Sequence, residues 1–322
     1  MLYNIQILRF FAALAVVQYH VIDVLASYGF QQDFMELFKG WGASGVDLFF
    51  VISGFVLYRI VLTRDIGPVE FLRDRVTRIV PLYWFFTILM ALALISFPEV
   101  TRSETFDPLR LIFSLFFLSG LAGHSFPVLG VGWTLEYEFF FYAVITFGLA
   151  IGLKGKLLPV AGAIFAALFF AGWGSTMFFE FLFGMLAATL TKGVWKGAGA
   201  LWILLLGLAL TIASVPLTGE GYDRALIYGL PSFLIVVALA VRSQVRQGFL
   251  TLLGDASFSI YLTHQPILSA LGKILQRFFP NVNGDMAAFL VIVVLVLIGT
   301  VTYLIIERPI IRWFKVLTRR VP

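Results

Sequence analysis

The feature that most constrains this chain is a series of long apolar runs separated by short polar loops. A helical run of roughly 20 residues spans the hydrocarbon core of a bilayer, and lipid excludes open strands because every backbone N–H and C=O must be paired internally. Hydrophobic residues make up 60% of the 322 and charged residues only 13%, which is atypical of a soluble domain. We therefore predict an all-α fold, a polytopic integral membrane helical bundle. The runs lie at about 5–25, 44–62, 79–97, 109–121, 133–153, 156–173, 175–191, 199–216, 224–241, 257–275 and 286–306.

The run at 109–121 is too short to cross the membrane alone, so we expect a re-entrant or interfacial segment there and about ten transmembrane helices elsewhere. Loops rich in Lys and Arg favour the cytoplasmic side. Ten crossings with both termini cytoplasmic place the basic segment 59–78 and the loop with Lys154 on that side. We predict one transmembrane domain over 1–322, without an appended soluble domain.

The sequence contains no cysteine and three histidines. The lack of cysteine excludes disulfides, thiolate metal ligands and a thioester acyl-enzyme. The histidines show no close His/Glu spacing, so no metal site is expected. The net charge of +5 is accounted for by the loop residues that set membrane orientation, and we expect no nucleic-acid partner.

Ionisable residues inside apolar runs are costly, so each is a functional candidate. Arg9 and His20 stand eleven residues apart, which is about 16 Å along a helix and nearly three turns, so both face the same side. An imidazole is well suited to take a proton from a hydroxyl near neutral pH. The alternatives are that Arg9 reaches for the membrane surface and that His20 makes a packing hydrogen bond.

The second candidate is Asp47, in the run that starts Gly45-Val46-Asp47. We expect Asp47 to begin its helix at a depth near that of His20, where its carboxylate could orient the imidazole. A helix cap is the alternative role. Ser53 in the same run, or His20 itself, could carry an acyl-enzyme, although a single site that binds both substrates needs only a base and an oxyanion donor.

Two further clusters carry charge. Glu138 and Tyr142 are one turn apart and share a helical face, and an acid so close to lipid should face a polar cavity. Arg75 and Arg78 line one face three residues apart, a geometry suited to binding phosphates. Charge that only sets membrane orientation is the alternative for the arginines.

Together these motifs resemble, in order along the chain, the acyltransferase-3 family of membrane O-acyltransferases. Thr134 departs from the family pattern, since it replaces the usual Ser of a Trp-Ser-Leu motif. The matching segments are Arg9 with His20, Gly45-Val46-Asp47-Leu48-Phe49-Phe50, Ser53-Gly54-Phe55, Arg75-x-x-Arg78, Trp133-Thr134-Leu135, Glu138-x-x-Phe141-Tyr142, Gly254-Asp255, Tyr261-Leu262-x-His264 and Glu307-Arg308-Pro309.

The resemblance implies an enzyme of the cytoplasmic (inner) membrane. It would move an acyl group, acetyl being favoured, from cytoplasmic acyl-CoA to a hydroxyl of an envelope or exported carbohydrate, or of a lipid-linked glycan. Acyl-CoA would be a donor substrate, with no permanently bound cofactor. His20 would be the general base, Glu138 the family's helix acid, and Arg9, Arg75 and Arg78 the acyl-CoA-binding residues. Supporting or acceptor-binding roles fall to Ser53, Tyr83, Trp133, Tyr142, Tyr261 and His264.

Other functions fit the same charges. A multi-spanning transporter or flippase of a glycan or small solute would use buried ionisable residues as a transport path. A non-catalytic assembly subunit would tolerate replacement of His20. His264 could donate to an oxyanion or serve packing alone.

Overall fold

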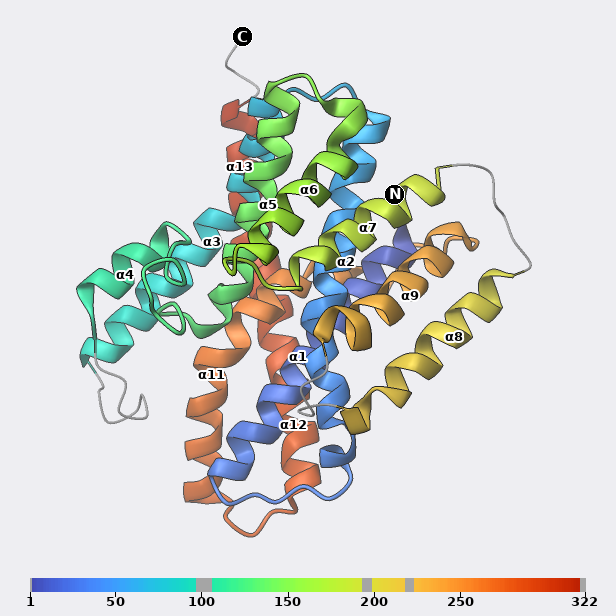
Figure 1. Ribbon diagram of the computed structural model, residues 1–322. Coiled ribbons are helices and arrows are strands. Elements are labelled where there is room, and N and C mark those ends of the chain that lie inside the picture. The colour runs from blue at the N-terminus through green and yellow to red at the C-terminus, as the bar shows by residue number, and fades with distance from the viewer. Residues whose placement is uncertain (1, 97–105, 193–198, 218–222, 319–322) are drawn as a thin grey trace. The chain divides into compact units, whose positions relative to one another are not determined.

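A computed structural model describes residues 2–96, 106–192, 199–217 and 223–318 (Figure 1). All regular secondary structure in these ranges is helical, which confirms the predicted all-α class. The helices are α1 (Tyr3–Ser27), α2 (Lys39–Thr63), α3 (Pro68–Ser96), α4 (Pro108–Leu115), α5 (Trp133–Ala150), α6 (Leu157–Phe170), α7 (Phe178–Leu190), α8 (Ala200–Ala213), α9 (Leu230–Val241), α10 (Phe249–Asp255), α11 (Ser257–Phe278), α12 (Gly284–Thr302) and α13 (Arg308–Thr318). The shorter helical turns are η1 (Met35–Phe38), η2 (Gly130–Gly132), η3 (Lys154–Lys156), η4 (Val215–Leu217), η5 (Ala225–Gly229) and η6 (Tyr303–Glu307).

The number of membrane crossings is the point where prediction and structure differ. Four helical segments within the described ranges are long and apolar enough to cross a membrane, namely Tyr3–Ser27, Met35–Thr63, Pro68–Ser96 and Gly284–Phe314. The prediction of about ten is therefore not confirmed. Helices α6 and α8 have 14 residues each and rise only about 21 Å, short of the roughly 30 Å core. The 109–121 run contributes the eight-residue α4, which confirms that it cannot cross alone.

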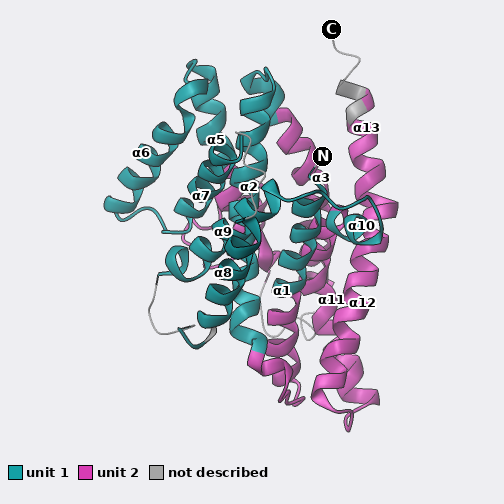
Figure 2. Cartoon of the chain, turned by 90° about the vertical axis from the view of Figure 1, so that its right-hand side faces the viewer, with its two compact units in different colours: residues 1–16, 38–72, 140–254 teal, residues 17–37, 73–139, 255–322 magenta. Residues whose placement is uncertain are grey.

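The chain divides into two compact units, which are drawn in different colours in Figure 2. Unit 1 consists of residues 1–16, 38–72 and 140–254, and unit 2 of residues 17–37, 73–139 and 255–322.

In unit 1, α2 packs against α7 and α9, and α8 packs against α9. Two glycines allow the backbones of α2 and α7 to approach closely. A Cβ on Gly54 would overlap the carbonyl oxygen of Phe181, and a Cβ on Gly184 would overlap that of Val51. Small residues at a crossing are the usual means of packing helices in lipid, where apolar burial between helices gives little driving force.

In unit 2, α11 packs along α12 and also contacts η2. The approach of α11 and α12 again depends on a glycine, since a Cβ on Gly299 would lie 2.5 Å from the Cα of Ile260. The start of α12 is fixed by the Asn283 side chain, which accepts the Met286 N–H at 3.1 Å. Helix α11, packed along α12, carries several of the polar side chains of the candidate active site.

Candidate active site

His20 and His264 lie side by side in unit 2, on α1 and α11. Their ring centroids are 5.2 Å apart and the ring planes are tilted by 33°. His264 is completely buried, whereas His20 is half-buried and has the Tyr19 ring edge-on at 5.4 Å. The structure therefore brings together two imidazoles that are 244 positions apart in the sequence.

Beside the imidazoles, α11 holds the entry to α5 through both backbone groups of Val131. The Gln265 Oε1 accepts the Val131 N–H at 3.0 Å, and the Tyr261 hydroxyl donates to the Val131 carbonyl at 2.9 Å. Thr134 completes the set, with its Oγ1 2.8 Å from the Tyr261 hydroxyl and 3.1 Å from the Val131 carbonyl. These hydroxyls serve positioning, because each has one hydrogen and the bonds within the cluster use it.

The two acidic residues at the start of α5, Glu136 and Glu138, lie in different environments. Glu138 is half-buried and interacts electrostatically with the Tyr261 hydroxyl. Glu136 instead accepts the N–H groups of Ser119 and Gly120, each at 2.9 Å. Glu136 therefore anchors the turn that follows α4.

That turn includes an unusual backbone conformation. Phe117 has φ of +59°, the left-handed region, which costs a residue with a side chain roughly 1 kcal/mol or more. Its ring is stacked between those of Tyr83, at 4.7 Å, and Phe139, at 3.8 Å. Tyr83 is fully buried and donates to the Ser114 carbonyl at 3.1 Å, so its hydroxyl is already engaged in positioning this segment. Trp133 is half-buried and lies edge-on to Tyr137 at 5.8 Å.

The two predicted phosphate-binding arginines are both half-buried on α3, while Arg73 beside them is exposed. Arg78 lies within electrostatic range of the Tyr303 hydroxyl, as do Asp255 and Arg308. Unit 2 thus gathers Arg78 and two motif segments from much later in the sequence around one tyrosine.

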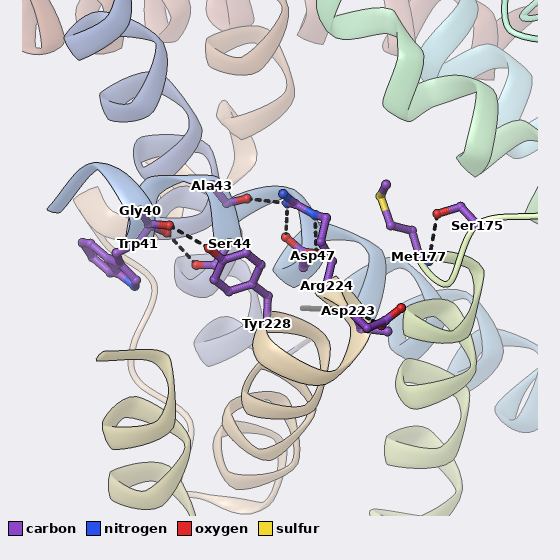
Figure 3. A network of polar contacts seen from close by, with 11 residues as sticks. Gly40, Trp41, Ala43, Ser44, Asp47, Ser175, Met177, Asp223, Arg224 and Tyr228 are labelled. Atoms are coloured by element: carbon purple, nitrogen blue, oxygen red, sulfur yellow. Dashed lines mark hydrogen bonds and ion pairs between the residues drawn. The ribbon is translucent and has the colours of Figure 1, made fainter. Parts of the chain in front are cut away.

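Asp47 has a partner in unit 1 that we did not predict from the sequence (Figure 3). Arg224 binds both carboxylate oxygens, with Nε 3.2 Å from Oδ1 and Nη2 2.6 Å from Oδ2, and Nη2 also donates to the Ala43 carbonyl at 2.9 Å. The guanidinium lies over the Tyr228 ring at 5.2 Å. Asp47 is completely buried, and so is Glu180, whose carboxyl lies beside it.

The prediction that Asp47 begins its helix is wrong. Helix α2 begins at Lys39, eight residues before Asp47. The Gly-containing segment between them is helical. Asp47 is therefore an interior residue and not a cap.

Arg224 and Glu180 were missed for different reasons. Glu180 lies within a predicted apolar run, so the rule that a buried ionisable group is a candidate would have found it. Arg224 stands at the edge of a run beside Asp223, where a charge is usually solvated. Its partner, 177 positions away, gives no sequence signal.

The remaining predicted residues are also in unit 1. Arg9 and Ser53 are half-buried, and Tyr142 is buried with its ring edge-on to Phe71 at 6.4 Å. The roles predicted for these three stay predictions.

Comparison with known proteins decides the family. A family model described as an acyltransferase domain matches residues 2–305. The chain belongs to the acyltransferase-3 family. It is 33% identical to the exopolysaccharide production protein ExoZ of Rhizobium meliloti (strain 1021), over 84% of this chain and 90% of ExoZ. It is 25% identical to the acyltransferase MdmB of Streptomyces mycarofaciens, over 95% of this chain and 90% of MdmB.

A third similar protein is BcsY of Komagataeibacter xylinus, named as a membrane-bound transacylase, which is 28% identical over 84% of this chain and 77% of BcsY. No solved structure matches the chain.

Two acyltransferase-3 motif residues now have a physical explanation. Gly45 lies against α1, where a Cβ would meet the Ala12 carbonyl oxygen at 2.5 Å, so the motif glycine is a packing requirement within unit 1. Thr134 uses only its hydroxyl in the cluster with Tyr261, and a serine would supply the same group. The departure from the family pattern at this position therefore preserves the contact.

Proposed function

We propose that this acyltransferase moves an acyl group, acetyl in the first instance, from acyl-CoA to a hydroxyl of an exported or envelope carbohydrate, with His20 as the general base. The observation that carries the proposal is the location of His20. It is a half-buried imidazole on an apolar helix, in the same unit as Glu138, Arg75 and Arg78.

The proposed reaction is a direct transfer. One nitrogen of His20 takes the proton of the acceptor hydroxyl while the oxygen attacks the thioester carbonyl carbon. The tetrahedral intermediate then collapses, the C–S bond breaks, and the departing thiolate takes the proton back from the imidazolium. The products are an ester and free CoA, with no net change in protons.

Arg75 and Arg78 are the proposed binding residues for the phosphates of CoA. Guanidinium groups suit this task because they stay charged and present several N–H donors in a plane. We place this phosphate site on the cytoplasmic side, where acyl-CoA is available, in a protein of the cytoplasmic membrane with both termini cytoplasmic. A carbohydrate acceptor is supported by the similarity to ExoZ, whose name refers to exopolysaccharide production.

Asp47 and Glu138 are both candidates to assist His20, and we propose Glu138 for that role. It lies in the same unit as His20, and in the proposed role its negative charge stabilises the imidazolium that forms during transfer. Both oxygens of Asp47 are engaged by Arg224, and we assign Asp47 a structural role in unit 1.

The test uses mass spectrometry of exported glycans from cells that contain or lack this protein, followed by complementation with variants. We expect acyl groups to disappear without the protein and to return with the wild type. His20→Ala should reduce transfer by about 10²- to 10⁴-fold, the usual contribution of a general base. Normal acylation by His20→Ala at normal membrane abundance would refute the proposal.

Donor binding is tested separately with acetyl-CoA and detergent-solubilised protein. Arg75→Ala and Arg78→Ala should each weaken binding, because each removes one cation from the phosphate site. Arg73→Ala is the matched control, since this exposed arginine lies on the same helix and should bind acetyl-CoA as the wild type does. Equal loss in all three would indicate a general charge effect rather than a site.

A further inference from the structure

One ring nitrogen of His264, Nε2, is buried and its role is not explained by the contacts described above. Its Nδ1 lies 2.6 Å from the backbone carbonyl of Tyr261. A carbonyl can only accept a hydrogen bond, so Nδ1 must bear the hydrogen, and the Nε2 of the neutral ring is then a lone-pair acceptor. Nε2 is buried and has no hydrogen-bond partner among the described residues. A buried acceptor without a donor is unfavourable, so it is expected to meet a donor in some state of the protein.

His20 is the neighbouring ring that can provide this donor. When two imidazoles join through an N–H···N bond of about 3 Å, their centroids are about 5.2 Å apart, because each nitrogen lies about 1.1 Å from its ring centre. The observed separation is 5.2 Å with a tilt of 33°. Rotation of the half-buried His20 ring about its Cβ–Cγ bond redirects its nitrogens while its centroid stays nearly in place, and the observed separation is the one that such a bond requires.

We propose that His264 is the positioning residue of His20. Its Nε2 accepts one N–H of His20 and so fixes the tautomer that presents the opposite nitrogen to the acceptor hydroxyl. This inference rests on the proposed function of His20. A hydrogen bond that fixes the tautomer of His20 keeps a lone pair on the nitrogen that accepts the proton. The carboxylate of a Ser-His-Asp triad performs the same task.

The rest of the cluster makes His264 a firm support. Tyr261 and Gln265 join α11 to the segment that enters α5. Tyr261 lies about one turn before His264 on the same helical face, and Gln265 directly follows His264. The charged and titratable groups near the pair are Asp23 and Tyr19 on α1, Tyr261 on α11, and Glu138 on α5 near Tyr261. Asp23, one turn beyond His20, is the competing partner for its N–H.

Two substitutions of His264 separate the positioning role from a merely structural one. In His264→Asn, the amide nitrogen can replace Nδ1 and keep the bond to the Tyr261 carbonyl, but the acceptor at the Nε2 position is lost. In His264→Gln, the side-chain oxygen can reach the Nε2 position and restore the acceptor. We expect His264→Asn to lower kcat by about tenfold or more with an unchanged KM for acetyl-CoA, and His264→Gln to recover kcat to within about threefold of wild type.

The same measurements on Asp23→Asn and His20→Ala complete the experiment. Loss of kcat in Asp23→Asn together with wild-type kcat in His264→Asn would overturn the inference and assign the N–H of His20 to Asp23. Activity in His264→Asn equal to or above that in His264→Gln would show a structural role and also overturn it. Retained activity in His20→Ala would instead refute the proposed function, and the inference with it.

Discussion

The ion pair between Asp47 and Arg224 gives a quantitative prediction for stability. Arg224→Ala leaves a completely buried carboxylate without its two charge-assisted hydrogen bonds. Breaking a buried pair from one side costs about 3–5 kcal/mol. The Arg224 side chain is 34% exposed, so water can partly replace it and screening reduces the loss. We therefore expect a decrease of about 3 kcal/mol in the free energy of unfolding.

The control is the double variant Asp47→Leu with Arg224→Met. It removes both charges and leaves no orphaned ion, and such replacements are often neutral or stabilising. We expect its loss to be below about 1 kcal/mol.

The free energy of unfolding is measured by reversible unfolding of the detergent-solubilised protein in SDS, monitored by tryptophan fluorescence. Acyl transfer is measured separately and expressed per folded molecule. Our assignment of a structural role to Asp47 predicts that the double variant keeps activity within about threefold of wild type. A double variant less stable than Arg224→Ala would refute the stability reasoning. A stable double variant with activity lost by 10²-fold or more would return Asp47 to the catalytic residues.

Three other substitutions test contacts within the two units, each by the same unfolding measurement. Thr134→Val should cost about 1–2 kcal/mol because it removes a buried hydroxyl from the Tyr261 cluster, whereas Thr134→Ser should be nearly neutral. Gly184→Leu should cost about 3 kcal/mol or more, since its side chain would overlap backbone of α2 that cannot rotate away. Gly155→Ala, where a Cβ meets nothing within 4 Å, is its control. Glu136→Gln should cost about 1–3 kcal/mol and speed hydrogen exchange at the Ser119 and Gly120 amides, because an amide cannot accept both N–H groups. Unchanged exchange there would contradict the anchoring role of Glu136.

The sequence predicts the helices well and the contacts between them poorly. Each apolar run contains a helix, because hydropathy reports directly on burial in lipid. The same signal does not fix helix ends, and the extension of α2 back to Lys39 made Asp47 an interior residue. The predicted number of crossings is not confirmed for a related reason, since runs such as 156–173 contain a helix of only 14 residues.

Partners in space are the part that the sequence alone does not specify. The pairing of Asp47 with Arg224 and the approach of His20 to His264 both join residues that are far apart in the chain. Helical periodicity relates residues within about two turns of each other, and it carries no information on which helix lies opposite. The motif order identified the family without indicating these contacts.

The double recognition of Val131 by α11 has a mechanical consequence. Both bonds reach the main chain from residues one turn apart, so sliding or turning α11 by a single residue would break the two at once. Small, graded displacement is therefore disfavoured, and the segment that carries His264 and the start of α5 should respond to a bound substrate as one rigid piece. Both hydrogen bonds are made to backbone groups of Val131 and do not depend on its side chain. Apolar substitutions of Val131 should therefore leave this coupling intact.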